Sequence, residues 1–299
     1  MILKSPIGSE LNGSRLDEAV SKLFAGVSKS EARRIIDRGG CTINAVMVRV
    51  ASRPVKAGDV IYIGVMEPGR YHDLELPPEA LLYEDDDLVA LNKPEGVNSQ
   101  RTPYQLKGTL EYWVSEYFRT RGINEPCRVV HRLDRGTTGA MVFPKHKKAA
   151  AWLSGCFKDG MVEKCYLAQV CGVPQQEHWT VDAPVGPLGK GRQGVVDSGR
   201  PAVTHFRMRA CGHRYSLVEA LPQTGRTHQI RVHLAHCGLP IVGDNLYGGE
   251  PAGRMMLHCL SMVFRGWPGG VLKIEAPCDE RFSAAGRGMA DTPAPLLSV

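Results

Sequence analysis

The 299-residue sequence lacks several patterns that would place it in common protein classes. Its nine cysteines are odd in number and form no Cys-x-x-Cys pair, which argues against a disulfide framework and against a zinc knuckle. No run approaches the roughly 20 apolar residues that cross a bilayer, and the first residues lack the apolar core of a signal peptide. We therefore expect a cytoplasmic protein with reduced cysteines that is neither exported nor membrane-embedded.

Three catalytic or cofactor-binding patterns are also absent or out of context. No Gly-x-Ser-x-Gly nucleophile elbow occurs. The histidines at 228, 233 and 236 do not have the His-Glu-x-x-His spacing of a metal site, so no metal is expected. Gly189–Gly194 spells G-x-G-x-x-G, but no strand-to-helix context surrounds it, which excludes a dinucleotide site.

The same glycine-rich stretch contains Lys190 and Arg192. Basic residues on a flexible loop often contact nucleic-acid phosphates. The segment is therefore predicted to be a basic RNA-contacting loop, with a plain surface loop as the alternative.

Composition favours an ordinary globular protein with an acidic partner. The chain is long enough for about two domains, and 43% of its residues are apolar. Lysine and arginine number 37 against 31 aspartate and glutamate residues, which gives a net charge of +6 and a pI near 8.8. This mild basic excess suits a polyanion such as nucleic acid without requiring one.

Residues 13–66 have the pattern of a small separate module. Apolar residues between Leu16 and Leu23 recur at helical spacing. The stretch Ser28–Glu31 has the form of a capping box and predicts the start of a second helix, which Gly39-Gly40 ends. Short β-type runs follow, so the module is predicted to be a helix pair with a small sheet.

The second helix of this module carries a basic face. Ile35-Ile36 are expected to face a core, whereas Arg34 and Arg38 share an outer face with Arg33 nearby. Basic residues outnumber acidic ones by 9 to 5 over residues 13–66. The alternative is a solvated charged helix face.

The module resembles the alpha-L RNA-binding fold, named for a small-subunit ribosomal protein. The resemblance lies in the helix pair, in the opening Arg15-Leu16-Asp17 and in the closing Val55–Ile61 stretch. It implies that Arg33, Arg34 and Arg38 contact RNA.

The remaining chain is expected to form an α+β catalytic domain over residues 81–280. Short β-rich runs there are interrupted by few helices without strict alternation, which favours a mixed, largely antiparallel sheet. Residues 67–80, rich in proline and glycine, are predicted to be a linker. Residues 1–12 and 281–299 are expected to be terminal tails.

The large domain contains three motif-bearing stretches, 91–97, 129–145 and 221–249, and a separate Lys164-Cys165-Tyr166. Together they resemble the RluA-type pseudouridine synthases, which convert uridine in RNA to its carbon-linked isomer without metal or redox cofactor. The matching elements follow in the family's order: His131-Arg132-Leu133-Asp134, Thr137-Thr138-Gly139, Lys164-Cys165-Tyr166 and the block from Gly225 to His233.

The resemblance assigns the reacting carboxylate to Asp134, which either attacks the anomeric carbon of the ribose or removes a ribose proton. A carboxylate in a closed pocket needs an opposing charge, and Arg231 is the candidate. A short helix is predicted over residues 228–237, with Thr227 as its N-cap and Arg231 near the positive end of its dipole. An alternating strand is the other assignment for this segment.

Two further residues have roles implied by the resemblance. Tyr166 is expected to stack on the target base, and its hydroxyl could aid proton removal at carbon 5. Arg132 is expected to contact RNA beside the extruded nucleotide. Lys93 is expected in the pocket wall or its scaffold.

The sequence therefore predicts an RNA pseudouridine synthase, acting as a monomer on large-subunit ribosomal RNA. One alternative is a non-catalytic RNA-binding or ribosome-assembly factor on the same scaffold. A synthase acting on transfer RNA is the other.

Overall fold

The computed structural model describes residues 2–37, 40–64, 74–101, 105, 107–189, 191–267, 270–278 and 282. The chain divides into two compact units. The small unit comprises Met1–Glu75 and Gln100–Tyr117, and the large unit comprises Leu76–Ser99 and Phe118–Val299.

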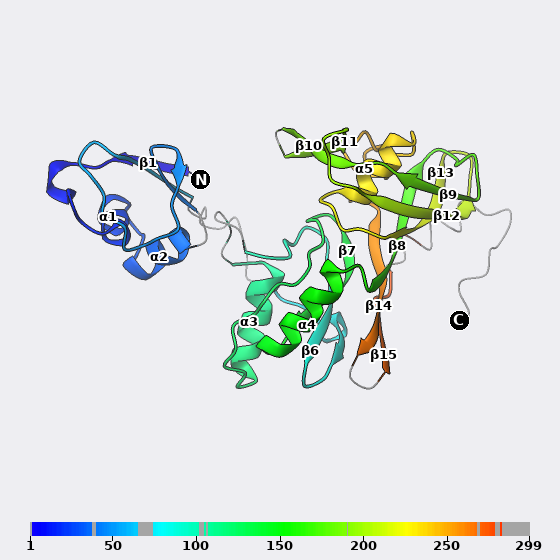
Figure 1. The fold of residues 1–299 in the computed structure, drawn as a ribbon, viewed down its shortest axis with the longest axis horizontal. Coiled ribbons are helices and arrows are strands. Elements are labelled where there is room, and N and C mark those ends of the chain that lie inside the picture. Colours follow the sequence, from blue (N-terminus) through cyan, green and yellow to red (C-terminus); the bar gives the residue numbers. More distant parts are fainter. Residues whose placement is uncertain are drawn as a thin grey trace. The chain divides into compact units, whose positions relative to one another are not determined.

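The N-terminal part of the small unit contains an antiparallel sheet of four strands in the order β1-β4-β2-β3, together with the helices α1 and α2 (Figure 1). Its elements are β1 (Ile2–Pro6), η1 (Ser9–Leu11), α1 (Leu16–Leu23), α2 (Lys29–Asp37), β2 (Cys41–Ile43), β3 (Val46–Met47) and β4 (Val60–Gly64). The predicted helix pair and short strands are therefore confirmed. The division between the two units falls within α3 (Leu110–Thr120).

The helices of the small unit follow the predicted pattern. Ile35 and Ile36 are buried in the core with the apolar residues of α1. The Glu31 N–H donates to Ser28 Oγ at 3.2 Å, which is one half of the predicted capping box. Arg33 and Arg34, on the opposite side of α2 from Ile35 and Ile36, are exposed.

Residues 2–12 do not form part of the predicted tail over residues 1–12. β1 pairs with β4 over its whole length, and Ile7 and Leu11 are buried in the core of the small unit. The prediction was wrong because this short strand is stabilised by pairing with a distant strand, which no local pattern reveals. Of the predicted linker, residues 67–73 lie outside the described residues, and Pro78–Ala80 form the 3₁₀ helix η2.

The large unit is built on a nine-stranded sheet in the order β5-β6-β7-β14-β8-β13-β12-β9, with β15 paired to β14 (Figure 1). Neighbouring strands are antiparallel except β7 and β14, which are parallel, so the predicted mixed, largely antiparallel α+β fold is confirmed. The strands are β5 (Leu81–Glu84), β6 (Leu88–Lys93), β7 (Thr138–Pro144), β8 (Val162–Cys171), β9 (His178–Asp182), β12 (Val203–Cys211), β13 (Tyr215–Pro222), β14 (Leu257–Trp267) and β15 (Gly270–Glu275).

Two helices and a hairpin complete the described part of the large unit: α4 (Lys147–Lys158), α5 (Gln229–His236) and the pair β10 (Val185–Gly189) and β11 (Arg192–Val195). The helix α5 packs on the face of the sheet that contains Thr204, whose hydroxyl lies 2.9 Å from His233 Nδ1. This face carries the pocket described below.

The parallel pair β7–β14 explains the Thr-Thr-Gly motif. Gly139 has φ +113°, and a Cβ at this position would collide with the backbone of Cys259. Thr138 Oγ1 lies 2.8 Å from His258 Nδ1 on the opposite strand. The glycine therefore permits the close approach of β7 and β14, and the threonine links the two strands. Both lie directly after the segment that contains Asp134.

The predicted tail over residues 281–299 lies outside the described residues except for Phe282. That ring is buried against His258 and Arg254, because it fills part of the core of the large unit. All nine cysteines are free thiols. In the described part of the chain, no helix is long and apolar enough to cross a bilayer.

Candidate active site

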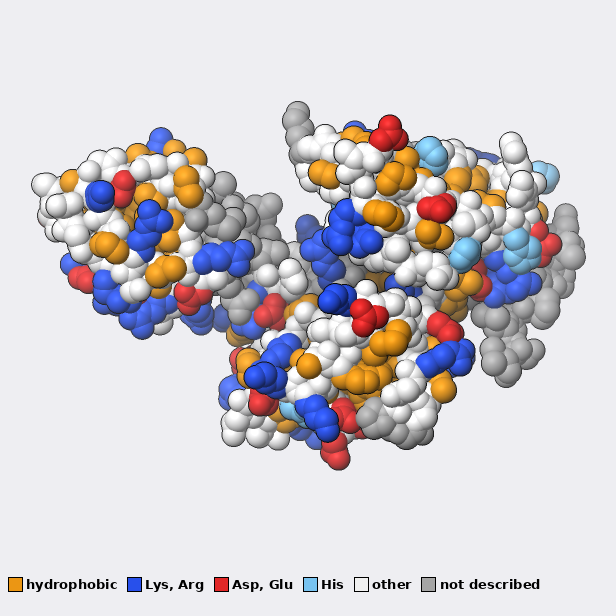
Figure 2. All heavy atoms as spheres, viewed as in Figure 1, with side chains coloured by type: hydrophobic (Ala, Val, Ile, Leu, Met, Phe, Trp, Pro, Cys, Tyr) orange, Lys and Arg blue, Asp and Glu red, His pale blue; other side chains and the backbone are white. Residues whose placement is uncertain are grey.

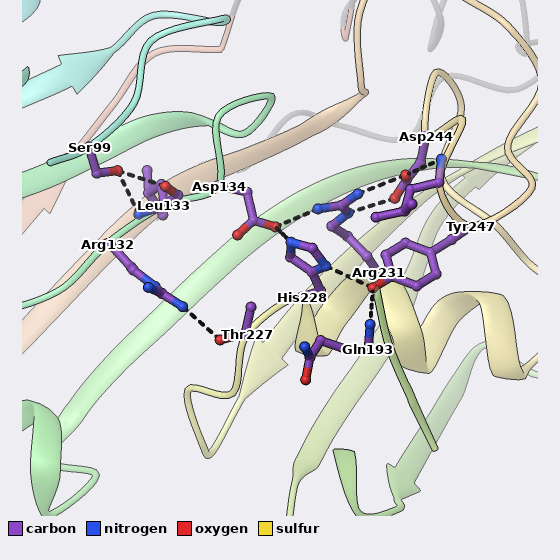
Figure 3. A network of polar contacts seen from close by, with 11 residues as sticks. Ser99, Arg132, Leu133, Asp134, Gln193, Thr227, His228, Arg231, Asp244 and Tyr247 are labelled. Atoms are coloured by element: carbon purple, nitrogen blue, oxygen red, sulfur yellow. Dashed lines mark hydrogen bonds and ion pairs between the residues drawn. The ribbon is translucent and has the colours of Figure 1, made fainter. Parts of the chain in front are cut away.

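Asp134 lies in an irregular segment that ends at β7. A turn closes after it, in which the Thr137 N–H donates to the Asp134 carbonyl at 3.0 Å. The preceding residue is fixed by Ser99, whose Oγ donates to the Leu133 carbonyl at 2.6 Å and accepts from the Leu133 N–H at 3.0 Å. The backbone around Asp134 is thus held on both sides, and Figure 3 shows the Ser99 side.

His131 fastens the same segment to the core. Its Nε2 accepts a hydrogen bond from the Val142 N–H at 2.9 Å, and its ring stacks on Phe157 with 4.4 Å between centroids. Burial lowers the pKa of His131 to about 3, so the ring is neutral at physiological pH and can act as this acceptor.

Arg231 lies in the first turn of α5, so the helix prediction for this segment is confirmed and the strand alternative is wrong. The N-cap is His228 rather than Thr227. Thr227 does not cap the helix because its Oγ1 accepts a hydrogen bond from Arg132 Nη2 at 2.7 Å. Cys237 follows the last residue of the helix and is exposed.

Arg231 joins two carboxylates (Figure 3). Its Nη1 donates to Asp134 Oδ2 at 2.8 Å, while Nε and Nη2 donate to Asp244 Oδ2 and Oδ1 at 2.7 and 2.9 Å. Burial opposes the charge on Arg231, but the hydrogen bonds and charges of Asp244 and Asp134 outweigh it and raise the pKa of the guanidinium. The bidentate pair with Asp244 fixes the fork so that one nitrogen is left for Asp134.

The two oxygens of Asp134 differ in their surroundings. Oδ2 receives Arg231 and lies 3.7 Å from His228 Nε2. Among the described residues, Oδ1 has no hydrogen-bond or ion-pair partner. The Asp134 side chain is 22% exposed, against 2% for Asp244. Oδ1 is therefore the oxygen left for a ligand.

Asp134 lines a cavity of about 150 Å³. Tyr166 and Lys164 of β8 form another part of the wall, and the segment from Pro222 to Arg231 forms the rest together with Leu257. Burial, followed by the nearby Cys259 thiol, raises the pKa of the Tyr166 hydroxyl well above its usual range, and burial lowers the pKa of Lys164. The pocket thus combines an aromatic ring, a carboxylate and buried cationic groups.

The predicted RNA contacts of the large unit lie at separate places. Arg132 is at the edge of the pocket, where it reaches Thr227. Arg192 is exposed, but it begins β11 and is not in a flexible loop, because β10 and β11 pair as an antiparallel hairpin. Lys190 lies outside the described residues.

His233, one of the three histidines considered above as metal ligands, has both ring nitrogens in hydrogen bonds, with the Thr204 hydroxyl and with the Ala183 carbonyl.

The predicted RNA contacts of the small unit are also divided. Arg34 is exposed on α2, while Arg33 Nε donates to the buried Asp17 Oδ2 at 2.6 Å. Arg38 lies outside the described residues. Figure 2 shows Lys and Arg side chains gathered over α2. This surface is the basic face that the sequence predicted.

Three residues of the site were missed by sequence reasoning. Asp244 and Tyr247 lie within the 221–249 stretch, and His228 was considered as a metal ligand and as a neighbour of Arg231 on one helix face, without a role toward Asp134. Tyr247 places its ring 4.9 Å from the Arg231 guanidinium carbon, and its hydroxyl lies 2.7 Å from His228 Nδ1. A carboxylate and a tyrosine inside a motif-bearing block were the available signal.

Comparison with known proteins identifies the family. The family profile described as RNA pseudouridylate synthase matches residues 87–236, and the S4 domain profile matches residues 14–61. This chain belongs to the RNA pseudouridylate synthase family. It is an RNA pseudouridine synthase with an S4 RNA-binding domain, and its substrate is RNA.

Individual relatives agree with this assignment. The chain is 32% identical over 255 residues to "Ribosomal large subunit pseudouridine synthase D" of Haemophilus ducreyi, covering 84% of this chain and 78% of the relative. It is 35% identical over 246 residues to an "Uncharacterized RNA pseudouridine synthase" of Bacillus subtilis, covering 80% and 87%. The solved structure of "Human RNA Pseudouridylate Synthase Domain Containing 1" aligns with a TM-score of 0.58 at 25% identity, covering 74% of this chain and 100% of that chain.

Proposed function

We propose that this protein isomerises uridines of large-subunit ribosomal RNA, with Asp134 as the carboxylate that engages the ribose. The observation that carries the proposal is the Asp134–Arg231 ion pair on the wall of a pocket that also contains the Tyr166 ring. An ion pair stabilises a carboxylate that is largely removed from water. The free Oδ1 then gives this carboxylate an oxygen for the substrate.

The reaction requires few groups from the protein. The bond between ribose C1′ and uracil N1 breaks, a bond from C1′ to C5 forms, C5 loses a proton and N1 gains one. Atoms and electrons therefore balance within the nucleotide. Asp134 can act as a nucleophile at C1′ or as a base toward the ribose.

Tyr166 is proposed to hold the uracil ring by stacking. Burial raises the pKa of its hydroxyl, so the hydroxyl is protonated at neutral pH, and the proposal rests on the ring rather than on proton transfer by the hydroxyl. Stacking is sufficient for its role, because the detached base must turn over without leaving the pocket.

RNA recognition is proposed to involve three basic residues of the large unit, Arg132, Lys190 and Arg192. Three arginines of the small unit, Arg33, Arg34 and Arg38, are proposed to contact RNA as well. Unstacking a base costs a few kcal/mol, which contacts to the flanking phosphates offset. The name of the Haemophilus ducreyi relative supports ribosomal RNA as the substrate. We propose a monomer, because Asp134, Tyr166 and Arg231 of a single chain complete the pocket.

The test is to map pseudouridines by carbodiimide reactivity in RNA from cells with the wild-type gene, with Asp134→Asn or with no gene. We expect Asp134→Asn to lose the same ribosomal positions as the deletion, while the purified variant still binds that RNA. Asp159→Asn, at an exposed aspartate after α4, is the matched control and should keep every position. Loss of transfer-RNA positions only would contradict the ribosomal assignment, and unchanged turnover in Asp134→Asn would contradict the role of Asp134.

A further inference from the structure

His228 is a second polar group directed at Asp134. Its backbone has φ +58° and ψ +17°, a left-handed conformation that is unfavourable for residues with a Cβ. Such conformations persist where surrounding contacts fix them, and they are common at functional sites. The side chain is 17% exposed and lines the same pocket as Asp134.

The contacts of Tyr247 favour one tautomer of His228. The Tyr247 hydroxyl accepts the Gln193 N–H at 3.0 Å and lies 2.7 Å from His228 Nδ1 (Figure 3). The hydrogen of this hydroxyl needs an acceptor, and the lone pair of Nδ1 is the acceptor within reach. The proton of the neutral imidazole is then on Nε2, which faces Asp134 Oδ2 at 3.7 Å.

The opposite tautomer is unfavourable for two reasons. It would direct the lone pair of Nε2 at the carboxylate of Asp134, and it would deprive the Tyr247 hydroxyl of its acceptor. Burial lowers the pKa of His228, with Asp134 acting against it, so the imidazole is neutral near pH 7. The charged groups around the ring are Asp134, Arg231, Asp244 and Arg132.

We propose that His228 is a positioning residue whose Nε2–H, together with Arg231, holds Oδ2 of Asp134 and thereby directs Oδ1 toward the ribose. The inference rests on the proposed function, because it specifies which oxygen of that carboxylate reacts. A distance of 3.7 Å exceeds a hydrogen bond. Hydrogen bonds of catalytic groups are often long without substrate and shorten in its presence.

The tyrosine that sets the tautomer is itself held by two elements. Its ring lies over the guanidinium of Arg231, and its hydroxyl is fixed by the backbone of β11, next to Arg192. Tyr247→Phe keeps the ring over Arg231 and removes only the hydroxyl. This variant therefore tests the effect of the hydroxyl on the His228 tautomer while the packing of the ring on Arg231 is kept.

Nitrogen NMR on protein labelled in the histidine rings tests the tautomer without RNA. Loss of one signal pair in His228→Asn identifies His228 among the 10 histidines, and Asn suits the left-handed backbone at this position. We expect the wild-type ring to be neutral with the proton on Nε2, and Tyr247→Phe to show a mixture of tautomers. A proton on Nδ1, or an imidazolium at pH 7, would overturn the inference.

Kinetics test the positioning role. Single-turnover release of tritium from large-subunit ribosomal RNA labelled at uridine C5 reports the reaction, and the RNA-concentration dependence separates the maximal rate from binding. We expect His228→Asn to lower the maximal rate by about 10- to 100-fold, the worth of a hydrogen bond to a charged group, with half-saturation unchanged. His228→Gln, whose amide N–H reaches the position of Nε2, should recover most of the rate.

The matched control is His236→Gln, on an exposed histidine of the same helix, which should behave as wild type. A His228→Asn variant as fast as wild type, or a His228→Gln variant no faster than His228→Asn, would reject the positioning role. Wild-type protein that releases no tritium would reject the proposed function together with this role. A wrong tautomer in active wild-type protein would reject the inference alone.

Discussion

The tripeptide Arg-Leu-Asp occurs in both units, as Arg15–Asp17 and as Arg132–Asp134, and the two carboxylates have opposite surroundings. Asp17 is fully buried, and both of its oxygens accept hydrogen bonds. Arg15 donates to each of them at 3.0 Å, and Arg33 adds a bond of 2.6 Å to Oδ2. Asp134 is partly exposed, and its contacts with the described residues are made through Oδ2.

The difference lies in where the arginine of each tripeptide points. Arg15 turns back onto Asp17, and its hydrogen bond is the main reason that the pKa of this carboxyl lies far below its usual range. Arg132 instead reaches Thr227, and an arginine from α5 takes its place beside the aspartate. A carboxylate with both oxygens used holds a structure together, whereas one with a free oxygen in a pocket is available for chemistry.

The most direct attempt to break this comparison replaces each aspartate by asparagine. We expect Asp134→Asn to lower turnover by at least about 10³-fold, within the range of acid–base and nucleophilic groups, with little change in stability. Asp17→Asn should lower the urea midpoint of the small unit and leave turnover on a short stem-loop RNA intact. Turnover and the urea midpoint are measured for both variants. Equal losses of turnover would refute the distinction between a structural Asp17 and a reacting Asp134.

A smaller loss of turnover is expected from a change at Asp244. Both oxygens of this carboxylate accept hydrogen bonds, as those of Asp17 do, but it lies in the large unit. Asp244→Asn should lower turnover by about 10- to 100-fold and destabilise the large unit by about 1–3 kcal/mol, because it removes the charged partner that orients Arg231. Tritium release at fixed time points measures turnover, and urea unfolding measures the free energy of unfolding. Asp182→Asn, at an exposed aspartate of β9, is the control. A variant with wild-type turnover would show that Arg231 is oriented by other contacts.

The residue before the tripeptide is Ser14 in the small unit and His131 in the large unit. Only His131 can titrate, so we expect a pH effect on the stability of the large unit. The pKa of His131 is lowered from 6.5 to about 3, so between these values the unfolded chain binds a proton that the folded protein does not. This contribution is fully present above pH 6.5 and is lost as the pH falls toward 3.

One such proton corresponds to a slope of about 1.4 kcal/mol per pH unit. Urea unfolding of the large unit across this range measures the slope. Replacement of His131 by Gln keeps an acceptor for the Val142 N–H and removes the titration. The variant should be less pH-dependent by that amount, and an unchanged slope would assign it to another group.

The smallest effect concerns the two arginines of α2. Arg34→Ala should weaken binding to ribosomal RNA and reduce the salt dependence by about 0.9 in the logarithmic slope, the value for one phosphate contact, without a change in stability. Arg33→Ala should also destabilise the small unit, because Arg33 pairs with Asp17. Filter binding at several salt concentrations, paired with thermal unfolding, separates the two. Identical behaviour of the variants would mean that the Asp17 pair contributes nothing.

Sequence reasoning succeeded where a local pattern determines the structure. The helix pair of the small unit follows from apolar spacing and a capping pattern. The helix α5 was predicted from a cap at Thr227, although the structure has His228 as the N-cap, and the apolar spacing of this segment also fitted a strand. The contact between Asp134 and Arg231, expected for a carboxylate in a closed pocket, is present. The roles of these residues stay predictions. Spacing did not reveal β1, whose pairing with β4 depends on a distant strand.

The rest of the site could not be predicted because it consists of tertiary contacts that residues before and after α5 make with this helix and with distant segments. Asp244 reaches Arg231 only after the turn that follows α5. Tyr247 meets His228 and Gln193 through contacts far apart in sequence. Thr227 has the sequence of a helix cap, but a distant arginine uses its hydroxyl. Side chains with several possible partners are assigned by tertiary packing.

The hydrogen bond between Arg132 and Thr227 orders a cationic side chain at the edge of the pocket before any RNA is bound. The bond is made by Nη2, and a guanidinium carries five N–H donors, so other donors remain for a phosphate. An RNA phosphate that meets them would bind a side chain whose rotamer is already fixed, and little conformational entropy would be lost on binding.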